Sequence, residues 1–567
     1  MIGEGEKMRN RKISLLSCIV AFSFLFSIGS FKTYAADNTV LNETKNIIKN
    51  FYVREVPDEV FDAATPEEMV NKLSKVMDDP YTQYFTAQGY SDFANSINMK
   101  FSGIGVYIDV VPGGIKINSV IDGAPAKESG LLPGDIIIQA DSHNLTGLPS
   151  EQATAYVKGV EGTSVKLLVK RGQDTLTFEV VRRQINIPTV EEKILDNHIG
   201  YIKISSFGDD TGEKFGEALQ TLEKSNPDNY IVDLRDNPGG YMNTALDIAG
   251  YFIGQNPAMQ IENRTAKEII NAYKQDKVID KPIIFVTNGN SASASEILSA
   301  AIKDYGKAFF VGTTTYGKGV AQGIYGLSDG SMIKMTSNNF YSPQGNKIHK
   351  IGISPDLPVV YPEAASDMVS QANAAVIDEY NALLVSELLL GKSDEKSNDK
   401  TDFIKLAMNG KEFEIDLKQA RQDKFWASFK YIINKCPELG AAVYLGTANG
   451  YVKMDASFSK NLLKAFYPIY KTFDKLNVLK NKVFNVKFSK SMEAASISPD
   501  SIELINSAHG QRVPVSYINI DDKTIGVKPI NELTPGSQYY LVVKPGLKSI
   551  LGAAVKDGSV VDVTVNN

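Results

Sequence analysis

Cysteine is nearly absent from this chain of 567 residues, which contains only Cys18 and Cys436. Cys18 lies in an apolar N-terminal run with the composition of an export signal, so a processed chain would keep one thiol. A single thiol cannot close an internal disulfide. An exported chain without disulfides is typical of a Gram-positive cell surface, and the apolar run continues well past Cys18, which disfavours a lipoprotein anchor there.

Histidine is also scarce, with four residues in the whole chain. Only His198 and His349 fall within the stretch that we expect to form an α/β core. The chain has no G-x-S-x-G nucleophile elbow, no H-E-x-x-H motif and no paired cysteines. These absences disfavour a histidine-based catalytic triad and a zinc enzyme, and we expect neither a metal nor another cofactor.

Positive charge is not concentrated anywhere after the first dozen residues, and the formal net charge is −6. A nucleic-acid partner held by phosphate contacts is therefore not expected. Hydrophobic residues make up 43% of the chain and charged residues 22%, which is typical of globular proteins. A chain of this length is expected to form roughly three to five domains.

The N-terminus has the pattern of a signal peptide that ends near residue 36. Basic residues including Arg9 and Lys12 precede an apolar run at 13–31, and Thr-Tyr-Ala-Ala follows at 33–36. The alternative is an uncleaved membrane anchor, because the run approaches the roughly 20 residues that span a bilayer. We expect an exported, extracytoplasmic protein that is secreted, associated with the cell wall or anchored by its uncleaved signal.

Two different patterns follow the leader. Residues 37–97 show helical periodicity, and Thr65-Pro66 is a typical helix start with proline at the first helical position. From residue 98 to 183 the pattern changes to short strands and turns, with one helix-like stretch, "SEQATAYVKG". We therefore expect an N-terminal helical module followed by a compact β-rich domain.

The β-rich stretch contains "GAPAKESGLLPGDIII", and its order of elements resembles a PDZ domain. The resemblance implies that backbone amides hold the terminal carboxylate of a peptide, which adds as a strand alongside. The residues of that segment are Gly103, Ile104, Gly105 and Val106. The resemblance also implies that the helix bearing Ala153 and Val157 walls a pocket for the last side chain. Outside this context, the two glycines would indicate only a β-bulge.

Residues 184–363 alternate predicted strands and helices, which indicates βα units around a mixed or parallel sheet. The stretch contains "DLRDNPGG", "NGNSASASEILSAAIKDYG" and "VGTTTYGKGVAQ" in that order. Together with the PDZ-like stretch, these motifs closely resemble the C-terminal processing (tail-specific) peptidases over residues 38–362. The resemblance implies a multidomain α/β protein with a crotonase/ClpP-like protease core and a Ser-Lys catalytic centre.

Catalytic roles follow from the same resemblance. It implies that Ser293 is the nucleophile, that Lys318 is the base and that Gln322, four residues further on, belongs to the same site. If the stretch after Lys318 turns helically, Gln322 is placed to steer the amine of Lys318 toward Ser293. Residue chemistry gives separate support for the base. With histidine scarce, a neutral lysine must take the serine proton, and burial must lower the pKa of Lys318 from a reference value of about 10.4. Taken alone, Lys318 would be interpreted as a solvated surface charge.

Ser293 is expected where a strand and loop give way to a helix, so the unpaired amide of Ala294 would lie beside its hydroxyl. The alternative for this stretch is a simple capping box, with Glu296 reaching back to the cap amide. The family resemblance implies that Ala294 supplies one oxyanion donor.

The second oxyanion donor implied by the resemblance is a glycine of "DLRDNPGG". Gly239 is favoured and Gly240 stays open, since this chain has Pro238 where family members often have a second glycine or an asparagine. The structural alternative for this motif is an ion pair between Asp233 and Arg235 at a strand end, followed by an ordinary turn.

The chain continues well beyond the protease-like stretch. Residues 364–482 contain a helical segment, a polar linker and a hairpin signal at Asn409-Gly410, and we assign no chemistry to this accessory region. Residues 483–567 resemble a bacterial Ig-like β-sandwich of the kind found on surface proteins. Its expected role is attachment or spacing.

The sequence as a whole predicts an exported serine endopeptidase that recognises the free C-terminal tails of protein or peptide substrates and cuts upstream of them. Two alternatives remain open, namely a non-catalytic tail-binding surface protein and a hydrolase of cell-wall peptides. Association with the membrane or cell wall, and a homodimer, also remain open.

Overall fold

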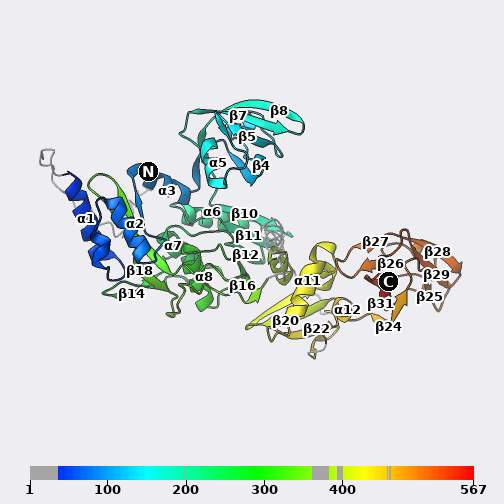
Figure 1. Cartoon of the computed structure of the whole chain (residues 1–567). Helices are drawn as coiled ribbons and strands as arrows, with labels where there is room; N and C mark the ends of the chain where they lie inside the picture. Colours follow the sequence, from blue (N-terminus) through cyan, green and yellow to red (C-terminus); the bar gives the residue numbers. More distant parts are fainter. Residues whose placement is uncertain are drawn as a thin grey trace, which may run out of the picture. The chain divides into compact units, whose positions relative to one another are not determined.

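The computed structural model describes residues 36–196, 198–359, 382–391, 400–455, 458 and 461–566 (Figure 1). The predicted export signal up to residue 35 lies outside the described residues, as do the polar linker and much of the helical segment predicted after residue 364. Within the described ranges, no helix is long and apolar enough to cross a membrane.

The chain folds into two compact units. The first contains the described residues up to Asn186 together with 260–269 and 319–341, and the second contains 187–259, 270–318 and the described residues from 342 onward. Two segments of the protease-like stretch therefore belong to the same unit as the N-terminal helices. The motif that contains Lys318 and Gln322 is thus divided, with Lys318 in the second unit and Gln322 in the first.

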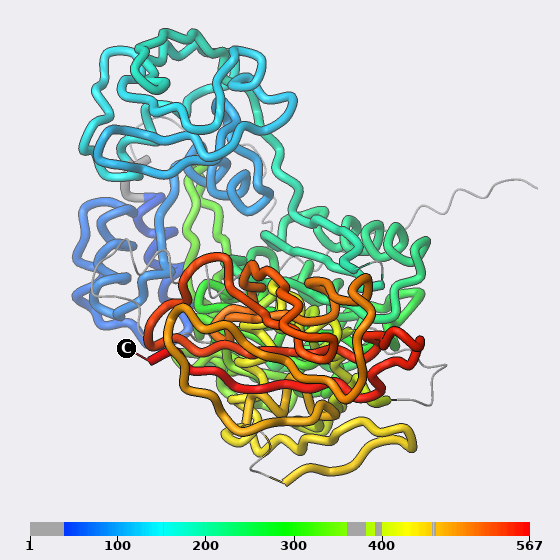
Figure 2. The backbone as a smooth tube through the Cα atoms, turned by 90° about the vertical axis from the view of Figure 1, so that its right-hand side faces the viewer, coloured from blue at the N-terminus to red at the C-terminus, as the bar shows by residue number. Residues whose placement is uncertain are grey.

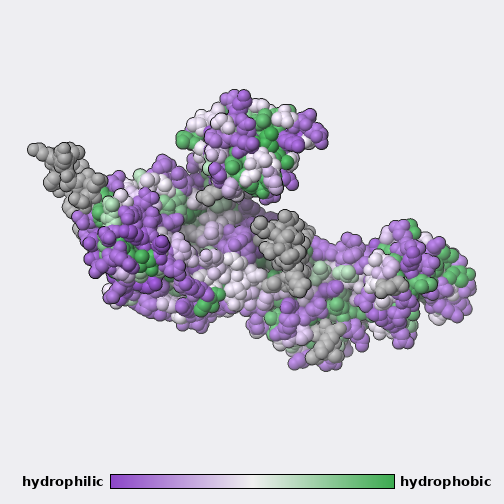
Figure 3. All heavy atoms as spheres, in the orientation of Figure 1, coloured by the Kyte–Doolittle hydropathy of each residue, from purple (hydrophilic) through white to green (hydrophobic). Residues whose placement is uncertain are grey.

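The first unit begins with the helices α1 (Ala36–Phe51), α2 (Pro66–Val76) and α3 (Ala87–Ile97). Thr65 caps α2, because its hydroxyl accepts a hydrogen bond of 3.1 Å from the Glu68 amide. The apolar side of α1 and α2 packs in one core with β18 (Met332–Tyr341). The face of these helices seen in Figure 3 is mostly hydrophilic, as expected of amphipathic helices.

Strand β18 is the centre of a five-stranded sheet. It pairs with β1, β13 and β17, and β14 pairs beyond β13. The bounds of these strands are β1 (Gln83–Phe85), β13 (Pro257–Glu262), β14 (Lys267–Asn271) and β17 (Val320–Gly326). The β1 strand thus links the N-terminal helices directly to a hairpin that follows the lysine motif in sequence.

A β-rich domain, expected from the sequence to resemble a PDZ domain, follows α3 in the first unit. Its main sheet has the order β3-β4-β5-β7-β8, with β3 at one edge. The elements are β3 (Val106–Val111), β4 (Gly114–Val120), β5 (Ile136–Ala140), β7 (Ser164–Arg171), β8 (Asp174–Val181), α4 (Pro125–Glu128) and α5 (Ser150–Val157). Figure 1 shows α5 lying against this sheet. The edge position leaves one side of β3 unpaired by the described strands.

The second unit is built on a sheet of the order β10-β11-β12-β15-β16-β19, in which all neighbours from β11 onward are parallel. Its strands are β10 (Val190–Leu195), β11 (Ile199–Ile204), β12 (Asn229–Asp233), β15 (Ile283–Thr287), β16 (Phe309–Gly312) and β19 (Leu357–Pro358). The helices are α6 (Thr211–Glu223), α7 (Met242–Ile253) and α8 (Ala294–Asp304). The carboxyl ends of the parallel strands meet at one edge, which is where α/β proteins usually place their sites.

The accessory region packs on this sheet through one continuous apolar core. Phe309 of β16 contacts Phe413 edge to face, with ring centroids 4.8 Å apart. The region contains a helical segment at 382–389 and a four-stranded sheet with three helices. Their bounds are β20 (Phe403–Met408), β21 (Lys411–Asp416), β22 (Ala442–Thr447), β23 (Gly450–Lys453), α10 (Leu417–Ala420), α11 (Asp423–Lys435) and α12 (Leu462–Phe466).

The C-terminal β-region, expected from the sequence to resemble an Ig-like domain, has two sheets, of the orders β24-β31-β30-β26-β27 and β25-β29-β28 (Figure 2, orange to red). The strands are β24 (Lys471–Val478), β25 (Phe484–Lys487), β26 (Ile502–Asn506), β27 (Arg512–Val513), β28 (Val515–Asp521), β29 (Thr524–Pro529), β30 (Gln538–Val543) and β31 (Ser559–Val565). Strand β24 pairs in parallel with β31, although the sequence places the start of this domain at residue 483. Most of β24 is exposed, so its hydropathy gives no strand signal.

Candidate active site

Ser293 stands at a sharp turn between β15 and α8. Its backbone has φ 57° and ψ −112°, a conformation that residues with a side chain rarely adopt. A strained strand-to-helix turn of this kind resembles the geometry of a nucleophile elbow, although the chain lacks the G-x-S-x-G motif that usually marks one. Ser293 is partly exposed and follows β15 on the carboxyl side of the parallel strands.

A buried carboxylate joins Ser293 to the segment that carries Lys318. The side chain of Glu296 is fully buried and accepts hydrogen bonds at Oε2 from the Ser293 amide, at 2.9 Å, and from the Lys318 amide, at 2.8 Å. Its other oxygen, Oε1, accepts from the Thr315 hydroxyl and the Gly317 amide, both at 2.6 Å. The amides of Ser293 and Lys318 therefore donate to the same oxygen atom, so these two backbone segments lie close together.

Sequence reasoning missed this second role of Glu296. The capping contact to Ser293, which was the alternative interpretation of this stretch, is present in the structure. The same carboxylate also holds the loop at 315–318, and capping alone does not require that. One signal in the sequence could have shown it, because Glu296 lies among apolar and small residues on a helix that is buried from Ala294 to Ile302.

The glycine turn after β12 lies directly against the serine turn. A Cβ placed on Gly239 would lie 2.8 Å from the Cβ of Ser293 and 2.9 Å from the Ala294 nitrogen. Gly239 has φ 103°, so both space and conformation require glycine here. The buried Asn237 ties the two turns together, since its carbonyl accepts a hydrogen bond of 3.0 Å from the Ala292 amide.

Three amides near Ser293 differ in their hydrogen bonding. The Gly239 amide donates to Oδ1 of Asn237 at 2.9 Å. No described residue accepts a hydrogen bond from the amides of Gly240 or Ala294. Among the described residues, the amides of Gly240 and Ala294 therefore have no acceptor, whereas the amide of Gly239, which the sequence favoured as the donor, has one.

The ion pair that was the structural alternative for "DLRDNPGG" is also present. Asp233 is fully buried and accepts a hydrogen bond of 2.9 Å from Nε of Arg235 and one of 2.8 Å from the Tyr201 hydroxyl. Burial first, and then the nearby Asp233 carboxylate, raises the pKa of Tyr201 well above its usual value. This network fixes the end of β12 just before the glycine turn begins.

Gln322 lies on β17, whereas the sequence argument considered a helical turn after Lys318. The β17–β18 pairing shifts register between Ala321 and Gln322, so a β-bulge precedes Gln322. Nε2 of Gln322 donates to the Thr336 hydroxyl at 3.3 Å and to the Val320 carbonyl at 3.4 Å, which are long hydrogen bonds.

The PDZ segment shows why its second glycine is needed. Gly105 has φ 81°, and a Cβ there would lie 2.2 Å from the Cβ of Ala124. No described residue accepts a hydrogen bond from the amides of Ile104 or Gly105. By contrast, a Cβ on Gly103 would meet no atom within 4 Å, so space does not require glycine at that position.

The apolar residues that the sequence assigned to a tail pocket lie in the PDZ core. Ala153 and Val157 belong to the same buried cluster as Ile104. Half-buried apolar side chains of the edge strand β3, including Val106 and Ile108, pack against that cluster. The apolar surface beside β3 therefore comes partly from the strand itself.

Neither core histidine supports a different catalytic centre. His198 is buried at the start of β11, at the opposite edge of the sheet from Ser293, and its ring nitrogens lie 2.8 and 3.2 Å from the carbonyl oxygens of Asp196 and Leu390. These contacts attach the accessory region to the sheet. We assign no catalytic role to His349.

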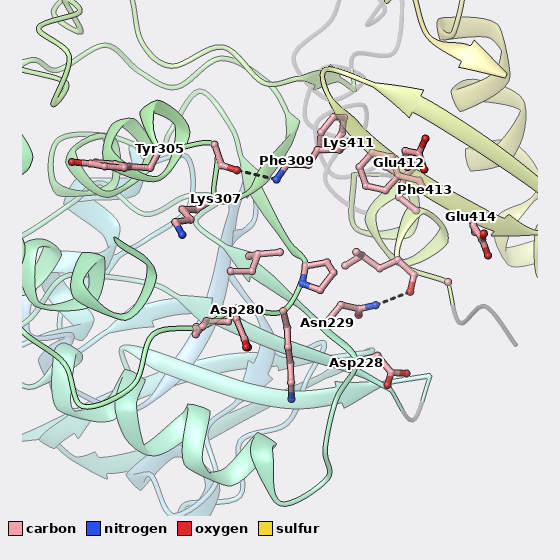
Figure 4. Close-up of a pocket in the computed structure, with 18 residues that line it drawn as sticks. Asp228, Asn229, Asp280, Tyr305, Lys307, Phe309, Lys411, Glu412, Phe413 and Glu414 are labelled. Atoms are coloured by element: carbon pink, nitrogen blue, oxygen red, sulfur yellow. Dashed lines mark hydrogen bonds between the residues drawn. The ribbon is translucent and has the colours of Figure 1, made fainter. Parts of the chain in front are cut away.

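A groove of about 1280 Å³ lies at that same opposite edge, between the starts of β12 and β15 and the β20–β21 hairpin (Figure 4). Its charged lining residues have both signs and include Asp280, Lys307 and Glu412. Asn229 crosses part of the groove, where its Nδ2 donates to the Leu390 carbonyl at 3.1 Å. The residues discussed around Ser293 do not line this groove.

Three regions of the chain match known protein families. Residues 198–359 match peptidase family S41, residues 102–181 match the PDZ domain and residues 473–562 match the bacterial Ig-like domain. Among solved structures, the chain is similar to the photosystem II D1 C-terminal processing protease, with 21% identity, a TM-score of 0.39, and coverage of 59% of this chain and 96% of that one.

Curated relatives give the stronger match. The chain is 35% identical over 329 residues to the carboxy-terminal processing protease CtpA of Bacillus subtilis (strain 168), covering 57% of this chain and 69% of the relative. It is 34% identical over 331 residues to CtpB of the same organism, covering 57% and 68%. The chain therefore belongs to the carboxy-terminal processing proteases of peptidase family S41, and it is a serine peptidase with a PDZ domain and a bacterial Ig-like domain.

Proposed function

We propose that this protein is an exported endopeptidase that captures the free C-terminal tail of a substrate in its PDZ domain and cleaves it with Ser293 and Lys318. The observation that carries the proposal is the shared carboxylate of Glu296, which accepts hydrogen bonds from the amides of both residues. A nucleophile at a strained, partly exposed turn and a lysine on a loop held by the same carboxylate are the parts that a Ser-Lys centre needs.

The reaction would run as acyl transfer in two steps. The hydroxyl oxygen of Ser293 attacks the scissile carbonyl while neutral Lys318 takes its proton, and the lysine then gives that proton to the leaving amine. Water, deprotonated by the same lysine, hydrolyses the acyl-enzyme. The oxyanion formed in each step would be held by the amides of Ala294 and Gly240, which have no acceptor among the described residues.

Tail capture would use the segment between β2 (Lys100–Gly103) and β3. The amides of Ile104 and Gly105 have no acceptor among the described residues and would hold a terminal carboxylate. The substrate would add as a strand to the unpaired edge of β3. The match to a bacterial Ig-like domain supports a location outside the cytoplasm, although the predicted export signal lies outside the described residues.

The proposal is tested with Ser293→Ala and Lys318→Ala on one long peptide, offered with a free and with an amidated C-terminus. We expect each variant to lose at least roughly a thousandfold in kcat because nucleophile and base act as a unit. The unaltered enzyme should cleave the free-ended peptide with the higher kcat/KM. Circular dichroism and thermal melting check that both variants fold.

Two outcomes would contradict different parts of the proposal. Near-normal hydrolysis by a folded Ser293→Ala or Lys318→Ala variant would overturn the catalytic assignment. Equal kcat/KM for the free and amidated peptides would overturn tail recognition, while leaving the catalytic assignment intact.

A further inference from the structure

A buried aspartate outside the protease motifs lies at the centre of a hydrogen-bond network in the first unit. Asp79 is 5% exposed and accepts a hydrogen bond of 2.7 Å from the Thr82 hydroxyl and one of 3.1 Å from the Tyr52 hydroxyl. It also accepts from the Tyr81 amide at 3.0 Å. Burial, and then the Asp79 carboxylate, raises the pKa of Tyr52 to about 12, so Tyr52 stays a donor at neutral pH.

The fourth donor to Asp79 connects this network to Gln322. The Thr336 hydroxyl donates to Oδ1 of Asp79 at 3.2 Å, and the same hydroxyl oxygen accepts from Nε2 of Gln322 at 3.3 Å. Gln322 and Thr336 are directly opposed in the β17–β18 ladder, so their side chains share one face of the sheet. Thr336 is 3% exposed, so water has little access to this path.

The donor and acceptor chemistry of Asp79, Thr336 and Gln322 determines which group donates in each hydrogen bond. A carboxylate oxygen accepts hydrogen bonds, so the hydroxyl of Thr336 uses its single hydrogen to donate to Asp79. The Thr336 oxygen can then only accept from Gln322, which turns the NH2 group of Gln322 toward Thr336. No described residue donates to Oε1 of Gln322, so this oxygen is left as the free acceptor of the side chain.

We propose that Asp79, acting through Thr336, is a positioning residue that sets the orientation of the Gln322 amide. This inference rests on the proposed role of Gln322, which would use its Oε1 to accept a hydrogen bond from the amine of Lys318 and so direct the lysine lone pair. A reversed amide would present NH2 to that amine, and two donors cannot form a hydrogen bond with each other.

The N-terminal helical module is what places Asp79. The aspartate follows the end of α2, where its amide donates to the Ser74 carbonyl at 2.9 Å. Two further contacts attach this module to the backbone of Thr336. The Val53 amide donates to the Thr336 carbonyl at 3.0 Å, and the Thr336 amide donates to the Thr82 hydroxyl at 3.1 Å. The module therefore supports both the backbone and the hydroxyl of Thr336, which contacts Gln322.

The test compares Thr336→Val, which removes the hydroxyl, with Thr336→Ser, which keeps it. We expect Thr336→Val to lower kcat roughly tenfold with KM changed less than about twofold, because the change affects amide orientation and leaves substrate contacts in place. Thr336→Ser should restore kcat to within about twofold of the unaltered enzyme. Asp79→Asn should behave like Thr336→Val, because an asparagine NH2 can donate to Thr336 and reverse the path.

The decisive measurement repeats Thr336→Val and Asp79→Asn in a Gln322→Ala background. If both residues act through Gln322, neither change should lower kcat further there. The matched control is Val70→Ala, which removes two buried methyl groups from the same module core without touching the path, and should lower the melting temperature with kcat unchanged.

The outcomes separate this inference from the proposed function. Losses that add to that of Gln322→Ala, or an equal loss from Thr336→Ser and Thr336→Val, would overturn the positioning role while leaving Gln322 in the catalytic centre. A Gln322→Ala variant with normal kcat would instead overturn the proposed role of Gln322. If Asp79→Asn does not fold, the comparison of Thr336→Ser with Thr336→Val tests the positioning role by itself.

Discussion

Glu296 holds the two segments that carry the predicted catalytic residues Ser293 and Lys318, because each of its carboxylate oxygens accepts two hydrogen bonds. A buried carboxylate with four donors is well satisfied, and leaving any of these donors without an acceptor is unfavourable. Three of the four donors are backbone amides, which cannot turn away when the acceptor changes. The residue therefore controls both the stability of the elbow and the position of the lysine loop.

The first prediction is that Glu296→Gln impairs both activity and stability. Glutamine offers one acceptor oxygen and places an NH2 group against backbone donors, so at least two donors lose their acceptor. We expect kcat/KM on a peptide substrate to fall by at least roughly 100-fold. The free energy of unfolding, measured with urea, should fall by roughly 2–4 kcal/mol.

The control for this prediction is the same substitution at Glu213, an exposed residue in the first turn of α6. Glu213→Gln should change the free energy of unfolding by no more than about 0.5 kcal/mol and leave kcat/KM unaltered. A Glu296→Gln enzyme with kcat/KM within about threefold of the unaltered one would show that the carboxylate does not organise the site.

Among the elements, the end of α6 shows how one surface cluster couples stability to pH. Glu223 accepts hydrogen bonds from the Tyr230 hydroxyl, from Lys281 at 3.0 Å and from Lys277 at 3.1 Å. The hydrogen bond from Tyr230 is the largest influence, and together with the two lysines it lowers the pKa of Glu223 to about 2. The cluster attaches α6 to β12 and to the loop before β15.

The second prediction, that stability depends on pH through Glu223, follows from the lowering of the pKa of this carboxyl group. A carboxyl whose pKa is lower in the folded state stabilises the fold above its ordinary pKa of 4.5, and this contribution is lost as the pH falls from 4.5 toward 2. Glu223→Gln should remove the dependence. Because Glu223 is partly solvated, we expect the unaltered protein to lose on the order of 1 kcal/mol more than the variant between pH 6 and pH 3.

Urea unfolding at pH 6, 4 and 3 measures this difference. Other carboxyl groups titrate in both proteins, so only the difference between the two pH curves reports on Glu223. Parallel curves for Glu223→Gln and the unaltered protein would contradict the assigned role of the cluster.

For the whole molecule, the sole tryptophan marks the junction between the accessory region and the Ig-like domain. Trp426 is fully buried, stacks on Phe466 with ring centroids 3.8 Å apart, and donates from Nε1 to the Ser507 carbonyl at 3.1 Å. A Cβ on Gly510 would lie 2.6 Å from the indole ring. The Ig-like domain is therefore docked on the accessory region through close side-chain packing.

The third prediction concerns two truncations. A chain that ends after Tyr470 removes the Ig-like domain and should keep peptide hydrolysis, while its tryptophan emission shifts to longer wavelength as Trp426 loses one side of its packing. A chain that ends after Gly391 also removes the accessory partners of Phe309 and Leu357 in the sheet core, and should aggregate or unfold at lower temperature.

The chain that ends after Gly391 is compared with the chain that ends after Tyr470. Unchanged tryptophan emission after removal of 471–567 would contradict the docking of the Ig-like domain at Trp426. A fully active and equally stable chain ending after Gly391 would contradict the shared core of the accessory region and the protease sheet.

Local patterns in the sequence were sufficient for the family, the fold class and the class of enzyme, a serine peptidase. The "SASAS" and "GKG" motifs, the PDZ phrase and the scarcity of histidine each depend on residues that are close together in the chain. The comparisons confirm the family, the PDZ domain and the Ig-like domain. The catalytic roles of Ser293, Lys318 and Gln322 stay predictions.

Long-range contacts account for what the sequence did not show. Glu296 gave only a capping signal, because its contacts with Thr315, Gly317 and Lys318 join residues about twenty positions apart. Asp79 and Thr336 are 257 residues apart, and no local pattern relates them. The preference between Gly239 and Gly240 likewise depends on whether the folded chain supplies an acceptor to each amide. Such contacts form when distant segments pack, so propensity and periodicity carry no signal for them.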